Sequence, residues 1–247
     1  GTWVHLYLNG LYWGVYNPTE RPDSSFLASY LGGEPEEYDA LKNHEEFIDG
    51  DAHAYLEALT LIQNDPLRFR AGYRDLSSDA AYQRILGNDA KGQDDPDLPN
   101  YVDVSSLIDY VIHGAYAAAY DWPGNFYMGR RRIADSSGVK FLMWDNEHGM
   151  KPGVEENRVL PHSRDADSPT KFYHALRSNE EFRVRFGDHL HRAFSPEGAL
   201  YVDPEDPEWN PSRPELNQPA ALWMELTGEI EEALIAESAR WGDTRTA

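Results

Sequence analysis

Two strand-like runs close together in the middle of the sequence limit the folds that the chain can adopt. NFYMGRRRI begins at residue 125 and GVKFLMWD ends at residue 145, with only the turn-forming residues ADSSG near 134–138 between them. Two strands joined by so short a turn predict a β-hairpin. Helical patterns precede and follow this pair, so the predicted class is α+β, with little sign of a doubly wound parallel sheet.

The remaining elements follow from turn residues and from the spacing of apolar residues. At the start of the chain, WVHLYLNGLYWGVYN alternates around Asn9-Gly10, and Asn-Gly suits the two positive φ angles of a type I′ hairpin turn. The segment 87–100 is rich in Gly, Asp and Pro and is predicted to be an exposed loop. Helical spacing of apolar residues predicts helices near 26–31, 52–65, 77–86, 103–120, 168–178, 179–194 and 218–241.

The composition excludes several classes of function. With 43 acidic residues against 22 basic ones, the formal net charge of −21 repels phosphate backbones, so no nucleic-acid binding is expected. The absence of cysteine excludes disulfides, thiolate metal sites and cysteine nucleophiles. No apolar run approaches the roughly 18 residues of a membrane span. The chain begins on a strand pattern with neither an initiator methionine nor a signal peptide, so we expect a piece of a longer or processed protein.

Acidic and amide side chains gather around the predicted central hairpin. Asp121 lies just past the end of a predicted helix, Asn125 at the start of the first strand, and Asp145 at the end of the second. Because a hairpin brings its outer ends together, we expect Asn125 and Asp145 to be neighbours, with Asp121 in the loop leading in. An acid, an amide four residues later, and a second acid after a strand pair form the layout with which protein kinases hold Mg²⁺ and phosphates.

Other interpretations of these residues remain open. Asp and Asn are common turn formers, so Asp121 could cap a turn, and Asn146 and Glu147 could be turn residues. Paired carboxylates also serve glycoside hydrolysis, for which Asp121, Asp145 and Glu147 would be suitable. The basic run at 130–132 places its side chains on alternate faces of a strand, which favours salt bridges to the acidic surface over a phosphate-binding patch.

Four stretches of the sequence resemble the spore coat protein H (CotH) kinase family, and the resemblance covers nearly all of the chain. LYLNGLYWGVYNPTERPDSSFL is similar to the family's Asn-Gly hairpin element, and YDALKN is similar to a segment that contains a lysine. VDVSSLIDYVIHGAYAAAYDWPGNFYMGRRR resembles the helix that leads to the family's Asp and Asn. KFLMWDNEHG resembles its WDxD strand end. The order and spacing of the four stretches together make the resemblance specific.

The resemblance implies an atypical protein-kinase-like fold, with a small β-rich part followed by a mostly helical lobe that carries the β-hairpin at the active site. It also implies transfer of phosphate from ATP to Ser or Thr of a protein substrate, with Mg²⁺ or Mn²⁺ as the metal. The family's roles, carried over by position, are catalysis by Asp121, metal binding by Asp145, Asn125 and Glu147, and nucleotide contacts by Trp144, Glu20 and Lys42. Glu20 and Lys42 would form an ion pair that positions the phosphates. The implied location is extracellular, on the cell surface or in a spore coat, as part of a larger chain.

The sequence departs from the family's pattern in two places. Where the family has WDxD, this chain has Trp144-Asp145-Asn146-Glu147, and the longer arm of Glu147 would alter the metal geometry. The family also carries a segment rich in Gly, Ser and Lys before the hairpin, and this sequence begins after it. We therefore expect one N-terminally truncated domain over 1–247, with 1–50 as the remainder of the nucleotide lobe and 51–247 as the helical lobe. A non-catalytic pseudokinase or structural module of a larger surface protein stays open as the alternative.

Overall fold

The computed structural model describes residues 2–43, 46–63, 74–118, 122–150 and 168–242 of the chain. Its contacts divide the chain into two compact units, residues 21–189 and residues 1–20 together with 190–247. Helices and antiparallel strands occur in both units, which confirms the predicted α+β class. The single-domain organisation and its division at residue 50 stay predictions.

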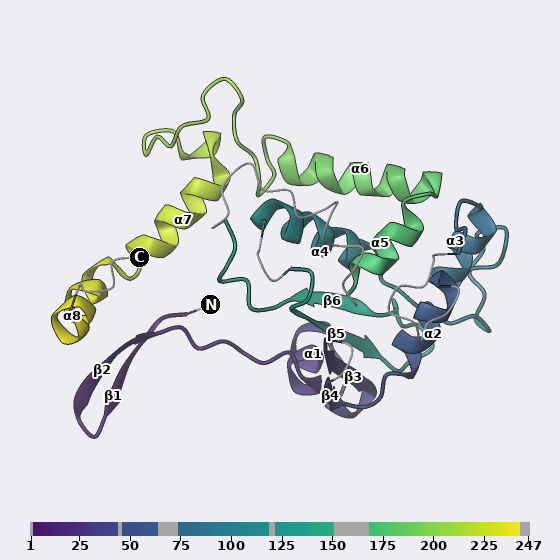
Figure 1. Ribbon diagram of the computed structural model, residues 1–247, viewed down its shortest axis with the longest axis horizontal. Helices are drawn as coiled ribbons and strands as arrows, with labels where there is room; N and C mark the ends of the chain where they lie inside the picture. Colours follow the sequence, from purple (N-terminus) through teal and green to yellow (C-terminus); the bar gives the residue numbers. More distant parts are fainter. Residues whose placement is uncertain (1, 44–45, 64–73, 119–121, 151–167, 243–247) are drawn as a thin grey trace. The chain divides into compact units, whose positions relative to one another are not determined.

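The larger unit is built on a four-stranded antiparallel sheet with the strand order β4-β3-β5-β6 (Figure 1). Its strands are β3 (Tyr38–Lys42), β4 (Glu46–Asp49), β5 (Phe126–Arg131) and β6 (Lys140–Met143). The sequence predicts the β5–β6 hairpin, and the structure confirms it. β3 and β4 are not predicted from the sequence, because β3 is short and carries the charged residue Asp39 among its buried positions.

Ion pairs between β5 and the chain around β3 compensate the buried charge of Asp39. Its carboxylate pairs with Arg132 and accepts a hydrogen bond of 2.9 Å from the Asp51 backbone N–H. Arg131 pairs with Glu37 at 2.7 Å. A buried carboxylate costs little only when it is paired and hydrogen-bonded, so these contacts explain how an acid is tolerated in the sheet. They also confirm that salt bridges occupy two members of the basic run.

Helices form where the sequence predicts them in the larger unit. Asp23, Ser78 and Asp103 each begin a helix by accepting a hydrogen bond from a backbone N–H of its first turn. The helices are α1 (Ser24–Leu31), α2 (His53–Ile62), α3 (Asp79–Ile85), α4 (Val104–Ala117), α5 (Thr170–Leu176) and α6 (Glu180–Phe194), with a short 3-10 turn at η1 (Pro35–Glu37).

The two faces of the sheet are covered by different helices. Leu27 of α1 is buried with Tyr38 and Ala40 of β3 on one face. A Cβ at Gly129 of β5 would stand 2.4 Å from Leu27 Cδ1, so only glycine lets α1 pack this closely. On the other face, the Phe172 ring of α5 lies 5.8 Å from the Phe141 ring of β6, centroid to centroid. The buried core thus continues from α1 through the sheet to α5.

The edge strand β6 is covered by α4 rather than left open to solvent. The Ser106 hydroxyl accepts a hydrogen bond of 2.9 Å from the Phe141 N–H and donates one of 3.2 Å to the Phe141 carbonyl. Asp103, which begins α4, forms an ion pair with Lys140 of β6. These contacts satisfy backbone groups of the edge strand and hold α4 against it.

We expect Ser106→Ala to destabilise the larger unit by about 1–3 kcal/mol, because the Phe141 N–H would be left buried without a partner. Urea unfolding followed by circular dichroism measures the change. Ser29→Ala, on the exposed side of α1, serves as the control and should stay within about 0.5 kcal/mol of the wild type. Equal stability of the two variants would show that Ser106 does not hold α4 to the strand.

The smaller unit begins with a two-stranded hairpin. It consists of β1 (Val4–Leu8) and β2 (Leu11–Tyr16), and Asn9 and Gly10 have φ angles of 51° and 80°. Both angles are positive, as the Asn-Gly pair predicts for a type I′ turn. The local sequence therefore determines this turn.

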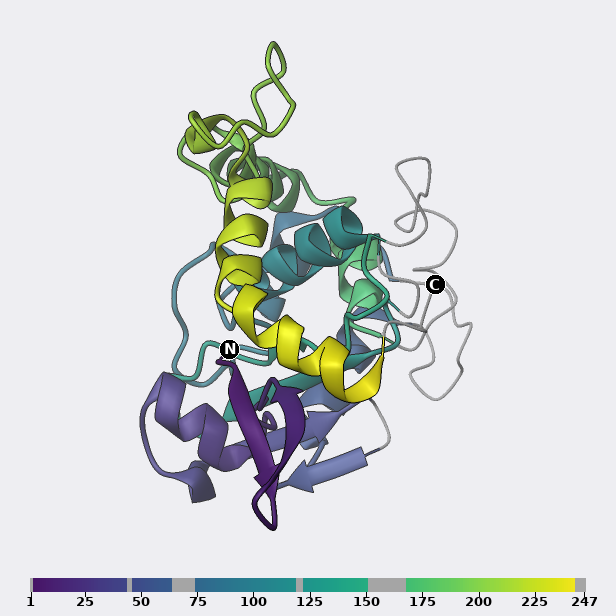
Figure 2. The same cartoon turned by 90° about the vertical axis from the view of Figure 1, so that its left-hand side faces the viewer.

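The helix predicted over 218–241 is wrong in one respect, because the structure contains two helices there. They are α7 (Gln218–Gly228) and α8 (Glu231–Trp241), visible in Figure 2 as a bent yellow pair, and a 3-10 turn η2 (Pro214–Leu216) precedes them. The interruption follows Gly228, whose poor helix propensity weakens the pattern at that point. α8 packs on β2, where Glu237 accepts a 3.1 Å hydrogen bond from the Val15 N–H. The Trp241 indole donates one of 3.1 Å to the Trp13 carbonyl.

Within the part of the chain that the structure describes, no helix combines the length and the apolar character needed to cross a membrane.

Candidate active site

Three of the predicted site residues lie at one end of the four-stranded sheet. Lys42, the last residue of β3, stands opposite Tyr127 of β5. In the next strand pair, Phe126 stands opposite Met143. Because the strands are antiparallel, the end of β3, the start of β5 and the end of β6 meet at the same edge. Lys42, Asn125 and Asp145 therefore share this end of the sheet, as the hairpin pattern predicts for Asn125 and Asp145.

Asn43 ties the end of β3 to the start of β5. Its backbone N–H donates a 2.9 Å hydrogen bond to the Phe126 carbonyl, and its amide nitrogen donates one of 2.9 Å to the Gly124 carbonyl. The residue has a φ of 53°, in the left-handed region that Asn tolerates better than most residues. These bonds hold the backbone on both sides of Asn125. Asn43 has no predicted role, and its position directly after Lys42 is the signal in the sequence that points to it.

The chain turns sharply where β6 ends. Asp145 has a φ of 58° and an exposed side chain. The Trp144 ring packs edge-on against Tyr127, with centroids 5.0 Å apart. The indole is therefore held by the neighbouring strand, while the carboxylate that follows it reaches solvent.

The turn after Asp145 is anchored to the C-terminal end of α4. The Met150 N–H donates a 2.6 Å hydrogen bond to the Ala117 carbonyl, and the Gly149 N–H donates one of 2.9 Å to the Asn146 carbonyl. The Asn146 amide nitrogen lies 3.3 Å from Nε2 of His113 on α4. Sequence reasoning missed His113, because only the tertiary structure brings α4 beside this turn.

Partial desolvation between α4 and the turn lowers the pKa of His113 from its ordinary value of 6.5, although part of its surface is exposed. Above pH 6.5 the residue is neutral in both the folded and the unfolded chain, so it adds no pH dependence. Below this pH the unfolded chain takes up the proton first, and stability falls until folded His113 is protonated too. We therefore expect His113→Gln to flatten the decline in melting temperature between pH 7 and pH 5, measured as the difference from wild type. Parallel profiles would contradict this assignment.

Glu147 lies at the start of the turn that follows β6, two residues after Asp145. Its side chain is exposed, and its Oε1 atom lies 3.4 Å from Nε2 of His148. For the described residues, no group of three or more His, Cys, Asp or Glu side chains stands close enough to hold a metal. Asp121 lies outside the described residues, so the full predicted set of Asp121, Asn125, Asp145 and Glu147 is not tested.

The chain on the C-terminal side of Asp121 is firmly packed. Trp122 is 3% exposed and its ring lies directly on α4 at Gly114, where a Cβ would be 2.1 Å from ring atoms. The Tyr110 hydroxyl donates a 3.3 Å hydrogen bond to the Pro123 carbonyl. The segment between Trp122 and Asn125 is thus held against α4 at one end and against β3 at the other.

Lys42 has an acidic neighbour on β4. Its ammonium group lies 3.7 Å from the Glu46 carboxylate, which also binds Arg21 at 2.8 Å. Glu46 of β4 therefore lies beside two cations, Lys42 and Arg21, at this end of the sheet. Glu20 belongs to the smaller unit, and its predicted ion pair with Lys42 stays a prediction.

A model of one protein family, described as CotH kinase protein, matches residues 1–197 of the 247-residue chain. The chain belongs to the CotH kinase family. The matched range contains every residue for which the CotH resemblance predicts a role, and it confirms the family assignment made from the four sequence stretches. No curated protein and no solved structure matches the chain.

Proposed function

We propose that this CotH domain is an atypical protein kinase that transfers phosphate from Mg·ATP to Ser or Thr of a protein. One observation carries the proposal: β-strand register gathers Lys42, Asn125 and Asp145 at one end of the sheet of a CotH family member. A cation for phosphates, an amide and a carboxylate are the kinds of side chain that phosphoryl transfer requires. The proposal includes a kinase-like fold with the β5–β6 hairpin at the active site.

The residues at the sheet end fit a hard divalent cation. Asp145 is exposed and Asn125 is partly exposed, so their side-chain oxygens are accessible to a metal. Mg²⁺ prefers oxygen ligands and takes the remainder from water and phosphates, and Mn²⁺ accepts the same donors. Asp145 and Asn125 would hold the ion, with Glu147 as a further ligand. When bound, the metal would neutralise charge on the phosphates of ATP.

Each remaining side chain has a role in positioning. Asp121 would accept a hydrogen bond from the Ser or Thr hydroxyl of the substrate and orient it. Lys42 would bind the phosphates as a compact cation, with Glu46 or Glu20 holding its ammonium group. Trp144 would contact the base. In these roles the protein mainly positions the reacting groups and stabilises their charge, as is usual in phosphoryl transfer.

A hollow beside the sheet end offers room for a substrate. It has a volume of about 500 Å³ and lies between α4 and β6, where His113 and Met143 contribute to its wall. Met143 is two residues from Asp145, so a group bound there would lie close to the proposed metal ligand. We further propose that this domain is extracellular, on the cell surface or in a spore coat, as part of a larger chain.

Calorimetric titration with ATP, with and without Mg²⁺, tests the proposal directly. We expect binding that requires the metal and that Asp145→Ala abolishes. Asp135→Ala makes the same change at the other end of the hairpin and should leave binding intact. Metal-independent binding, or equal binding by the Asp145→Ala variant, would remove the proposed site. Absence of ATP binding would favour a non-catalytic module, and sugar cleavage without ATP would favour a carboxylate hydrolase.

A further inference from the structure

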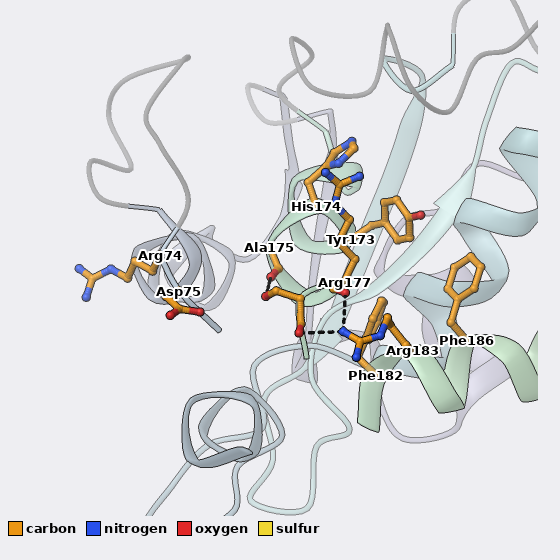
Figure 3. Close-up of a pocket in the computed structure, with 10 residues that line it drawn as sticks. Arg74, Asp75, Tyr173, His174, Ala175, Arg177, Phe182, Arg183 and Phe186 are labelled. Carbon is orange, nitrogen blue, oxygen red and sulfur yellow. Dashed lines mark hydrogen bonds between the residues drawn. The ribbon is translucent and has the colours of Figure 1, made fainter. Parts of the chain in front are cut away.

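A second hollow of the larger unit lies among α5, α6 and the segment before α3 (Figure 3). Its volume is about 670 Å³, within the roughly 300–1,000 Å³ that is typical of small-molecule sites. None of the residues with predicted roles in phosphoryl transfer lines it. It is therefore separate from the sheet end.

The charge of this hollow is opposite to that of the chain. Arg74, Arg177 and Arg183 line it in a protein whose formal net charge is −21. Over the described ranges, none of the three forms an ion pair with a carboxylate. The acid in the wall, Asp75, accepts a 2.9 Å hydrogen bond from the Ser77 N–H instead. Among the described residues that line the hollow, three arginines thus stand against one carboxylate, and the hollow carries an excess of positive charge.

Neutral groups hold one of these arginines in place. Arg183 Nη1 donates hydrogen bonds of 3.2 Å to the Arg177 carbonyl and 2.8 Å to the Ser178 carbonyl, at the end of α5. Carbonyl partners orient a guanidinium group without neutralising it, and other N–H donors of the fork remain for an anion. Figure 3 shows the Arg177 side chain running beside Tyr173 towards His174, away from the Arg183 guanidinium group, and Arg74 pointing away from both, so Arg74 adds charge rather than a direct contact.

Aromatic rings form the adjoining wall. The Tyr173 ring lies 5.4 Å from the Phe186 ring, and Phe186 lies 6.1 Å from Phe182, centroid to centroid. Phe182 is 1% exposed, and its buried ring packs against both Tyr173 and Phe186. A rigid aromatic surface beside cations favours a ligand that combines an anionic group with a flat, apolar part.

We propose that this hollow binds a phosphomonoester carried on an aromatic ring. Arg177, whose side chain lies beside Tyr173, would contact the phosphate, because a guanidinium group matches its oxygens in geometry and charge, and Arg183 would add positive charge. Tyr173 and Phe186 would contact the ring. The inference does not depend on phosphoryl transfer at the sheet end.

Calorimetric titration of the full chain with phenyl phosphate, phosphoserine and inorganic phosphate tests the proposal. We expect phenyl phosphate to bind most tightly of the three, and Arg177→Gln to weaken it about tenfold, as the loss of a charge-assisted contact predicts. No hydrogen bond of the Arg177 side chain to a described residue supports the fold, so this variant should remain folded. Arg192→Gln, an exposed arginine of α6 outside the hollow, should bind as the wild type does.

Three outcomes would overturn the proposal. They are no binding of phenyl phosphate by the wild type at millimolar concentrations, equal binding by Arg177→Gln and the wild type, and equal affinity for phenyl phosphate and inorganic phosphate. Asp145→Ala should retain phenyl phosphate binding, since the sheet end is a different site. Loss of binding in that variant would also overturn the proposal, because it would place the ligand at the sheet end.

Discussion

Asp145→Asn should lower the rate of phosphate transfer from ATP to protein by about 10²-fold or more. The substitution keeps the shape of the side chain and removes the negative charge that would hold the metal. Loss of one pre-positioned electrostatic contact typically costs about 10²–10³ in rate. Asp145 leaves β6 in a turn with a φ of 58° and an exposed carboxylate, so no other described function of its side chain accounts for such a loss. Transfer of labelled phosphate at saturating ATP measures the rate.

The metal dependence separates this effect from unfolding. Raising the Mg²⁺ concentration should restore part of the activity of Asp145→Asn, because weaker binding is overcome by mass action. Asp135→Asn, with the same change of charge, should retain activity near that of the wild type. Glu147→Gln should cost less than Asp145→Asn, since Glu147 is a further ligand in the proposal and its carboxylate already lies beside His148. Activity of Asp145→Asn within twofold of the wild type would contradict a role for this carboxylate.

Gly114→Ala should cause a clear loss of stability of the larger unit. The added Cβ would lie 2.1 Å from two atoms of the Trp122 ring, and Trp122 is 3% exposed. Overpacking in a close-packed core costs about 1–3 kcal/mol and occasionally more, which exceeds the gain of about 1 kcal/mol from better helix propensity. Thermal unfolding should show a lower midpoint, by about 2–4 °C for each net kcal/mol in a unit of this size.

A matched glycine provides the control. Gly187 lies on α6, and a Cβ there would meet nothing within 4 Å, so Gly187→Ala should stabilise the chain by up to about 1 kcal/mol. Adding Trp122→Leu to Gly114→Ala should recover part of the loss, because the smaller side chain removes the overlap. A melting point of Gly114→Ala equal to that of Gly187→Ala would show that the Trp122 contact is not tight. Since Trp122 follows Asp121 directly, we also expect Gly114→Ala to reduce phosphate transfer.

Local sequence was sufficient to predict part of the candidate site. Asn125 and Asp145 were expected to be neighbours because they flank two strands joined by a short turn, and the register of Phe126 with Met143 confirms the hairpin. A one-residue slip would move every side chain to the other face, so the buried face specifies the register. The position of Asp145 at the end of β6 is therefore a consequence of the pattern of nearby residues.

The pairing of β3 with β5 could not be read from the sequence. β3 is a short strand whose buried Asp39 interrupts the apolar pattern, and its partner is distant along the chain. The ion pair of Asp39 with Arg132 exists only once the two strands meet. Because β3 is not recognisable as a strand, only the family resemblance predicts that Lys42 lies near phosphates. The ion pair of Lys42 with Glu46 is likewise not predicted from the sequence.

The sequence by itself determined most of the helices, both hairpins, the acidic charge and membership of the CotH family. These features depend on φ preferences, turn chemistry and residue spacing, all of which act over a few neighbouring residues. Only the tertiary structure decided that α4 holds the turn after Asp145, through Ala117 and His113, and that unpaired arginines line a hollow at α5 and α6. Such contacts join distant segments, and they are selected by the joint burial of the whole core rather than by any local pattern.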